Sequence, residues 1–240
     1  VAVDRGDIGS DEYTGFRITA LWKITDQLDF TLAHAQQKIE QSGSPEVNLD
    51  LALDQQARLK TGPNGSNDEF LTADIDITNL LIEYDFGWGE LISSSSWLNY
   101  ETDSELDYSH LAFLSGPFYN KGTADIEVFV EELRFVSNLD GPIQFIAGYY
   151  FEDREADARA SWLWSGDPIL APSPFPRLDS LSDTPEEQTA FFGEISYAFT
   201  EQLTATLGGR HFDYERDRLT NFFINGSHLT QDKLLEKDES

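Results

Sequence analysis

The side chains that could do chemistry in this 240-residue chain are mostly carboxylates: 44 Asp and Glu against 16 Lys and Arg give a formal charge of −28. Two groups lie close together in the sequence, and their members are Asp103, Glu105 and Asp107, and Asp183, Glu186 and Glu187. Carboxylate oxygens are the ligands that Ca²⁺ and Mg²⁺ prefer. Neither group has the acid-and-glycine spacing of an EF-hand loop, so we interpret both as solvated surface charge.

Other catalytic arrangements are not indicated. With 44 acidic residues, some pair always lies at a distance suited to glycoside hydrolysis, so pairing alone indicates nothing. No G-x-S-x-G, H-E-x-x-H or P-loop pattern occurs. The four histidines are far apart and lack ligand spacing: His34, His110, His211 and His228. We therefore predict no enzyme, no metal site and no cofactor.

Composition excludes further classes. The strongly acidic balance argues against nucleic acid as a partner, because such proteins present a basic surface. The chain contains no cysteine, which excludes a disulfide scaffold and thiolate metal sites. No run approaches the roughly 18 apolar residues of a membrane helix.

Four aromatic residues are candidates for ligand binding. Phe118 and Tyr119 lie in the predicted loop 102–123, and Trp162 and Trp164 lie in the proline-rich predicted loop 154–187. Exposed aromatic side chains on long loops provide apolar contact area for a ligand. Local packing within the loop is the other interpretation.

The elements that must position these residues show alternation at period two. In residues 188–214, QTAFFGEISYAFTEQLTATLGGRHFDY, apolar Phe191, Ile195 and Tyr197 alternate with polar residues such as Glu194. A short polar turn after Thr200 leads into a second alternating run. Two such runs form a β-hairpin. Apolar residues on one face and polar residues on the other are typical of a transmembrane strand between lipid and a lumen.

The same pattern predicts four hairpins, or about eight strands. Their tight turns lie near Asp26, Gly87, Asp140 and Glu201. The strands are expected at residues 14–25, 28–37, 74–86, 91–100, 126–135, 143–151 and within the hairpin 188–214. The connections 38–73, 102–123 and 154–187 are predicted to be long loops, and 215–240 the start of a fourth; residues 47–59 fit either a helix or a strand. Asn225-Gly226-Ser227 is predicted to be a turn.

Charged residues on the polar strand faces have a predicted structural role. Arg134 and Arg210 lie on faces that would line a lumen. Because lumenal charges are normally paired, we expect them to contact carboxylates such as Glu132 or Glu194.

Two segments carry a family resemblance. VEELRFVSNLDGPIQFIAGYYFEDRE (130–155) and FFGEISYAFTEQLTATLGGRHFDYERD (191–217) resemble barrel hairpins of the TonB-dependent outer-membrane receptors. The resemblance implies an all-β, antiparallel, up-and-down transmembrane β-barrel segment with long extracellular loops. It also implies that residues 1–240 are part of one barrel domain, with the plug domain and the C-terminal strands absent.

The resemblance further implies a function. Receptors of this family lie in the bacterial outer membrane, in contact with its lipid, and take up scarce nutrients such as iron–siderophore complexes, cobalamin or carbohydrates. The inner-membrane TonB complex drives this uptake through the plug. The alternative is a soluble or cell-surface β-sandwich that binds carbohydrate through its aromatic loops, because alternation does not say which strand face points inward.

Overall fold

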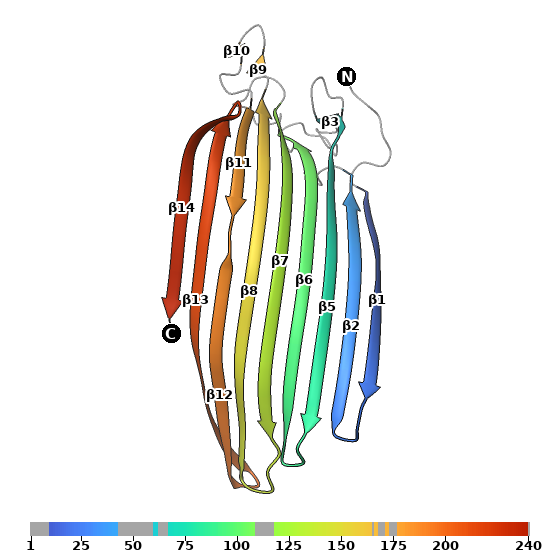
Figure 1. The fold of residues 1–240 in the computed structure, drawn as a ribbon, viewed down its shortest axis with the longest axis vertical. Helices are drawn as coiled ribbons and strands as arrows, with labels where there is room; N and C mark the ends of the chain where they lie inside the picture. The colour runs from blue at the N-terminus through green and yellow to red at the C-terminus, as the bar shows by residue number, and fades with distance from the viewer. Residues whose placement is uncertain are drawn as a thin grey trace.

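The computed structural model describes residues 10–42, 60–61, 67–108, 118–164, 166–167, 171–172 and 177–239. Every element in these residues is a β-strand (Figure 1). Ten strands form the main sheet: β1 Asp11–Lys23, β2 Leu28–Gln41, β5 Phe70–Asp85, β6 Gly89–Asp107, β7 Phe118–Ser137, β8 Ile143–Trp164, β11 Arg177–Asp183, β12 Glu186–Thr200, β13 Leu203–Ile224 and β14 Ser227–Glu239. Two short pairs lie apart: β3 Lys60–Thr61 with β4 Asn67–Asp68, and β9 Gly166–Asp167 with β10 Ala171–Pro172. The described part of the chain holds no helix able to cross a membrane.

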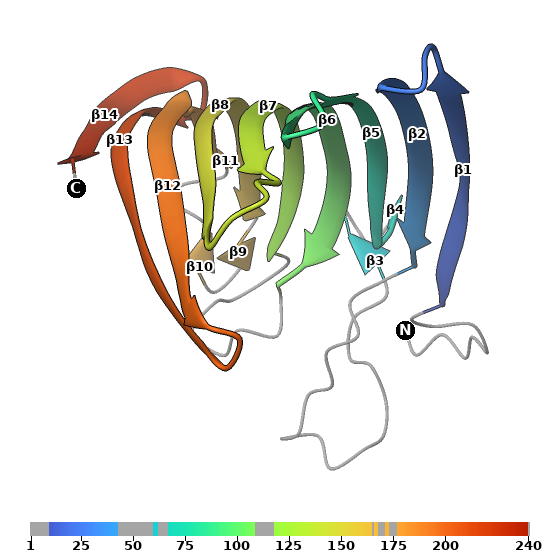
Figure 2. The ribbon, with the colours of Figure 1, turned by 90° about the horizontal axis from the view of Figure 1, so that it is seen from below.

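The main sheet is an antiparallel meander in which neighbouring strands follow one another along the chain, except that β11 and β12 lie end to end and each pairs with both β8 and β13. Figure 2 views the sheet from its turn end and shows β1 and β14 at opposite ends, so the described strands do not close into a ring. One sheet of ten strands is not the pair of packed sheets that a β-sandwich needs, so the alternative prediction of a sandwich is wrong. The predicted antiparallel up-and-down segment is confirmed, with more strands than the eight expected.

The four predicted tight turns all lie at one end of the sheet (Figure 1). Gly87 has a φ of +84°, which favours glycine, and its amide donates a hydrogen bond to Asp85 Oδ1 at 2.6 Å. The hydroxyls of Thr25 and Thr200 accept hydrogen bonds from backbone amides two residues further on. Local side-chain caps of this kind are strong turn signals, which explains why the sequence located this end of the sheet correctly.

The prediction that residues 154–187 form a loop is wrong for much of that segment. β8 continues to Trp164, and the chain returns as β11. β11 and β12 lie end to end between β8 and β13 and keep one register across the interruption, because Asp183 pairs with Asp157 and Glu186 with Arg154. Pro185 between them has no amide hydrogen to donate, so the ladder breaks there and resumes.

The segment 215–240 was predicted to be the start of a loop, and this prediction is also wrong. β13 continues to Ile224, and β14 returns along it. The predicted turn at Asn225-Gly226 joins the two strands, with φ values of 52° and 81°. Two successive residues with positive φ are the signature of the hairpin turn whose twist matches the flanking strands.

Other strands also extend into segments expected to be loops. β6 ends at Asp107 and β7 begins at Phe118, so the predicted loop 102–123 is partly strand. β2 and β5 likewise shorten the predicted loop 38–73, and residues 47–59 lie outside the described residues. β8 has 22 residues, or about 70 Å of extended chain, whereas a tilted strand crosses a bilayer in roughly 10. The strands therefore continue well beyond a membrane.

One sheet face carries an apolar band near the turns. Its members lie directly opposite one another across successive strands, as in the row Trp22, Phe30, Ile82, Leu133, Tyr149 and Phe191, which Ser93 interrupts on β6. Trp22, Phe191 and Leu207 are 68%, 63% and 76% exposed. Only three apolar residues in the described chain are buried: Ala73, Tyr119 and Ala190. Large exposed apolar side chains with so small a core fit a sheet that lies against lipid. We call this the outward face and the opposite one the inward face.

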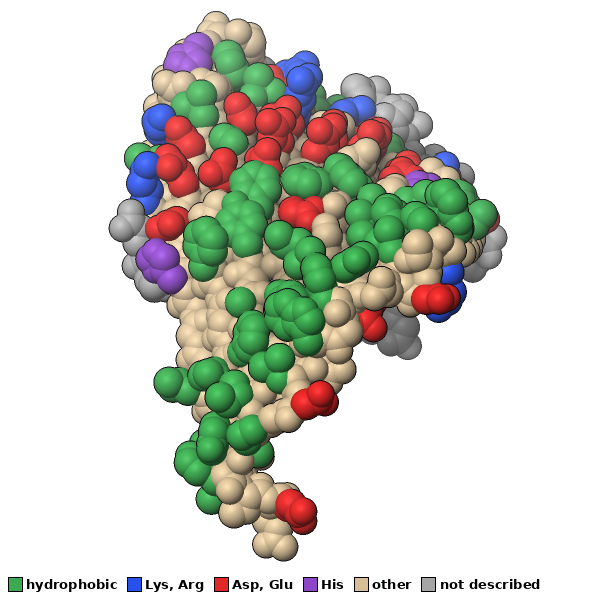
Figure 3. All heavy atoms as spheres, turned by 60° about the horizontal axis from the view of Figure 1, so that its bottom comes forward, with side chains coloured by type: hydrophobic (Ala, Val, Ile, Leu, Met, Phe, Trp, Pro, Cys, Tyr) green, Lys and Arg blue, Asp and Glu red, His purple; other side chains and the backbone are tan. Residues whose placement is uncertain are grey.

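Beyond the apolar band, the outward face becomes acidic, and the inward face of β5 to β7 becomes apolar. On the outward face, five carboxylates lie in one row across neighbouring strands: Asp74, Glu101, Asp125, Asp157 and Asp183. We call this row the acidic row. At the same height the inward face carries Ile75, Tyr100 and Ile126. Figure 3 shows hydrophobic side chains gathered over the turn end and a broad band of Asp and Glu beyond them. The strands thus pass from a lipid-facing part to a water-facing part.

Candidate functional site

The inward face of the turn-proximal half holds all four predicted lumenal charges. Arg134 and Arg210 lie in one row, because Arg134 is opposite Gly148, Gly148 opposite Phe192, and Phe192 opposite Arg210. Arg134 Nη1 lies 3.4 Å from Glu132 Oε1. The guanidinium of Arg210 lies over the ring of Tyr150, 5.3 Å from its centroid.

These charges form a dispersed polar lining. Glu194 lies on the same face, directly opposite Ile146 on β8 and Gly208 on β13. Tyr150 donates a short hydrogen bond to Glu152, which continues the polar surface along β8. Spaced charges of both signs are the lining expected of a water-filled passage.

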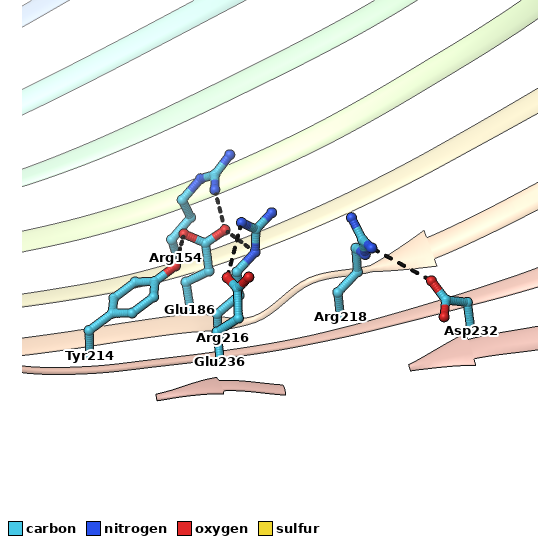
Figure 4. Close-up of polar contacts among 7 residues, drawn as sticks. All are labelled: Arg154, Glu186, Tyr214, Arg216, Arg218, Asp232 and Glu236. Atoms are coloured by element: carbon cyan, nitrogen blue, oxygen red, sulfur yellow. Dashed lines mark hydrogen bonds and ion pairs between the residues drawn. The ribbon is translucent and has the colours of Figure 1, made fainter. Parts of the chain in front are cut away.

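A row of alternating charge crosses four strands of the inward face, further from the turns. Its members are Arg154 on β8, Glu186 on β12, Arg216 on β13 and Glu236 on β14, each directly opposite the next. We call it the charge ladder (Figure 4). Arg154 Nη1 lies 2.6 Å and Arg216 Nε 3.3 Å from the same Glu186 oxygen, Oε1. Arg216 Nη1 lies 3.7 Å from Glu236 Oε2.

Glu186 is the centre of the ladder. Its side chain is 14% exposed, and it also accepts a hydrogen bond from the Tyr214 hydroxyl at 3.4 Å. Tyr214 points inward, and its sequence neighbours Asp213 and Glu215 point outward, beyond the apolar band. Burial, and then the charge of Glu186, raise the pKa of the Tyr214 phenol, because both disfavour the phenolate.

The guanidinium groups keep unused donors. Arg218 lies beside the ladder, with Nη2 3.6 Å from Asp232 Oδ2 (Figure 4). The Nε atoms of Arg216 and Arg218 are buried and have no hydrogen-bond partner; the contact of Arg216 Nε with Glu186 is close but lacks hydrogen-bond geometry. Guanidinium groups bind the oxygens of carboxylate and phosphate groups. The side chains of Arg216 and Arg218 are 32% and 39% exposed, so their guanidinium groups make this wall a candidate anion site.

An aromatic cluster lies at the loop end of the inward face. Phe118 and Trp162 stack with centroids 5.4 Å apart, and Tyr108 lies 5.3 Å from Trp162 and 6.3 Å from Phe118. The prediction that Phe118 and Trp162 lie in loops is wrong, because both lie at the ends of strands. Strand positions hold the rings more rigidly than a loop would.

Tyr119, the next predicted aromatic residue, does not join this cluster. Tyr119 follows Phe118 along β7, so its side chain points to the outward face, where it is 9% exposed. Trp164 lies opposite Phe118 in the β7–β8 register, but its side chain lies outside the described residues.

The two acidic groups of the sequence do not form compact ligand sets. Asp183 and Glu187 point to the outward face, whereas Glu186 points inward. Asp103, Glu105 and Asp107 follow one another on the outward face of β6, and Glu105 Oε2 lies 2.6 Å from Lys121 Nζ. Alternation along a strand separates neighbours in sequence onto opposite faces.

Sequence reasoning missed the charge ladder. Arg154, Glu186, Arg216 and Glu236 all fell in segments predicted to be loops. A usable signal was present: Tyr214, Arg216 and Arg218 continue the period of two, and Asn225-Gly226 is a strong hairpin signal. The alternation went unrecognised because polar residues occupy both faces there.

Comparison with known proteins identifies the fold through solved structures and not through sequence matches. No family model matches the sequence, and no curated protein matches it. Among solved structures, the chain is similar to the ferric yersiniabactin uptake receptor FyuA from Yersinia pestis, with a TM-score of 0.72 and 15% identity over 97% of this chain. It is also similar to the siderophore receptor PiuA from Acinetobacter baumannii, with a TM-score of 0.51 and 12% identity over 92% of this chain. The chain spans 34% of the first receptor and 42% of the second.

These likenesses agree with the apolar band, the short turns at one end and the long strands. At this identity they establish the architecture and leave ligands and partners to be proposed. The chain has the fold of part of the transmembrane β-barrel of TonB-dependent outer-membrane receptors.

Proposed function

We propose that residues 1–240 form part of the barrel wall of a bacterial outer-membrane receptor that takes up an iron–siderophore complex. The observation that carries this proposal is the structural match to a ferric-siderophore uptake receptor, which covers 97% of the chain. The whole chain then belongs to one barrel domain, and uptake is driven by the TonB complex through a plug domain outside this sequence. Cobalamin or a carbohydrate are the other nutrient classes that such a barrel serves.

The inward face supports a ligand path with two zones. The aromatic cluster of Tyr108, Phe118 and Trp162 lies where a ligand arrives from outside, and it provides rigid apolar surface. The charge ladder lies deeper, and the partly exposed guanidinium groups of Arg216 and Arg218 are the donors it would offer to carboxylate or phenolate oxygens. Ferric siderophores combine such oxygens with apolar or aromatic parts.

The test is growth and uptake in the source bacterium. Deletion of the gene for the full-length receptor should abolish uptake of radiolabelled iron from one ferric siderophore and slow growth in iron-chelated medium. Loss of the TonB complex should have the same effect, because uptake against a gradient needs its energy. Unchanged iron uptake with lost growth on cobalamin or a carbohydrate would replace the siderophore by that nutrient. Unchanged uptake of all three classes would refute the proposal.

A pair of variants tests the role of the inward face. Trp162→Ala in the full-length receptor should weaken ferric-siderophore binding about tenfold, as is usual for an aromatic residue central to a binding surface. Trp88→Ala is the matched control, because Trp88 lies at the turn end and packs on Phe135. Equal binding by both variants would exclude the aromatic cluster from the ligand site.

A further inference from the structure

A carboxylate lies inside the lipid-facing apolar band. Glu131 on β7 points to the outward face, directly opposite Phe151 on β8 and Ser95 on β6. Along its own strand, Leu133 and Phe129 are the outward-facing neighbours on either side. Ionisable groups at lipid-facing positions are costly, so such a group calls for a function.

Two serines hold this carboxylate in place. Ser93 Oγ donates a hydrogen bond to Glu131 Oε1 at 2.8 Å, and Ser95 Oγ donates a short one to Oε2. The intervening serines point the other way, where Ser94 and Ser96 accept hydrogen bonds from Asn79 Nδ2. The run of four serines thus serves two separate polar sites on opposite faces. An ionised carboxylate accepts about four hydrogen bonds, so Glu131 keeps acceptor capacity toward the lipid.

No described cation is available to neutralise Glu131. The outward-facing basic residues of β5 to β12 are Lys121, Arg159 and Arg177, and all three lie near the loop ends, beyond the acidic row. The nearest charged side chain on the outward face is another carboxylate, Asp153, which lies opposite Phe129. A compensating positive charge would therefore have to come from outside the described chain.

Aromatic rings flank the carboxylate on the side away from the turns. Trp97 and Phe129 lie in the next row, with centroids 5.4 Å apart, and Phe151 lies 6.2 Å from Phe129. Trp97 is 44% exposed. Aromatic faces attract ammonium groups, and a carboxylate beside them adds a hydrogen-bonded ion pair. This position, just below the acidic residues, is where lipid headgroups meet the barrel.

We propose that Glu131, Ser93 and Ser95, with the rings of Trp97, Phe129 and Phe151, form an outward-facing site for the ammonium group of a lipid headgroup. The serines hold both carboxylate oxygens, the rings cover one side, and the ammonium supplies the missing charge. The inference depends on the barrel fold and the lipid-facing position of Glu131, and not on which nutrient is taken up.

The test is lipid selectivity of the full-length receptor. The purified barrel is placed in vesicles of phosphatidylethanolamine and phosphatidylglycerol at equal amounts, with a chelator present to remove divalent cations, and extracted with its tightly bound lipids. Native mass spectrometry then measures the ratio of the two lipids retained. The wild type should retain phosphatidylethanolamine preferentially, and Glu131→Gln should reduce this preference about fivefold, the effect expected for loss of one desolvated ammonium contact.

Glu127→Gln is the matched control, because Glu127 is an outward-facing carboxylate on the same strand that lies opposite Asn99 and Glu155. It removes the same charge and should keep most of the preference. Equal loss in both variants would show that the general negative charge of the surface is responsible, and would overturn the site. An unchanged ratio in Glu131→Gln would also overturn it, and so would a preference that appears only when divalent cations are restored. Glu131→Gln retains a hydrogen-bond acceptor for the serines, and the far-ultraviolet circular dichroism of both variants verifies that the barrel has folded.

Discussion

Arg154 and Glu186 lie directly opposite each other on β8 and β12, with Arg154 Nη1 2.6 Å from Glu186 Oε1. The same Glu186 oxygen lies 3.3 Å from Arg216 Nε on the other side. One carboxylate therefore joins three strands through two guanidinium groups. It lies where the strands have left the apolar band, so this charge network holds together a part of the sheet that lipid does not support.

Glu186→Gln should lower the free energy of unfolding by about 2 kcal/mol, because two guanidinium groups would then face each other with no carboxylate between them. Guanidinium titration of the full-length protein in vesicles, followed by tryptophan fluorescence, measures the change. Asp232→Asn is the control: Asp232 pairs with Arg218, but its side chain is 60% exposed, so about 0.5 kcal/mol or less is expected. Similar losses in both variants would contradict a special role for Glu186.

The acidic row predicts a stabilising substitution. Asp125 lies between Glu101 and Asp157 on the neighbouring strands, and like charges directly opposite repel. Asp125→Asn should raise the free energy of unfolding by about 0.5 kcal/mol at low salt. The gain should largely disappear near 1 M salt, where screening acts within about 3 Å. Asp140→Asn, in an exposed turn, should change the free energy of unfolding little at either salt concentration. A gain from Asp125→Asn that does not depend on salt concentration would rule out repulsion as its cause.

A ring packed on a glycine predicts a strong coupling on the inward face. A Cβ on Gly148 would lie 2.2 Å from Phe192 Cζ, so the Phe192 ring rests on the glycine. Gly148→Ala should destabilise the protein by about 1–3 kcal/mol through overpacking. Phe192→Ala combined with Gly148→Ala should cost clearly less than the sum of the two single changes. Gly209→Ala, where no atom lies within 4 Å, is the control; additive effects at Gly148 and Phe192 would disprove the contact.

The hairpin between β13 and β14 depends on one glycine. Gly226 has a φ of +81°, a region that disfavours a Cβ atom. Gly226→Ala should cost about 1 kcal/mol locally and speed amide hydrogen exchange along β14, because that strand pairs only with β13 in the described sheet. Gly141→Ala, in a turn without positive φ, should leave exchange at its own hairpin unchanged. Equal exchange rates in wild type and Gly226→Ala would show that the turn does not determine the stability of β14.

The hairpins at the turn end can be predicted from the sequence alone. There, apolar residues such as Phe191 and Ile195 alternate with mostly polar ones, because one face meets lipid and the other water, and that contrast is visible within a short stretch of sequence. Turn residues such as Gly87 act within a few positions, so they could be read as well. The barrel fold itself followed from these two signals and from the resemblance they carry.

The far halves of the strands could not be predicted without the pairing between strands. Where the outward face becomes acidic and the inward face apolar or ionic, the lipid-based pattern no longer applies, so β11 and β14 were predicted to be loops. The partners of Glu186 and Glu131 depend on register between strands, and the period of two is the same for every register. Residues more than 30 positions apart, such as Arg154 and Glu186, become neighbours only when backbone hydrogen bonds align the strands.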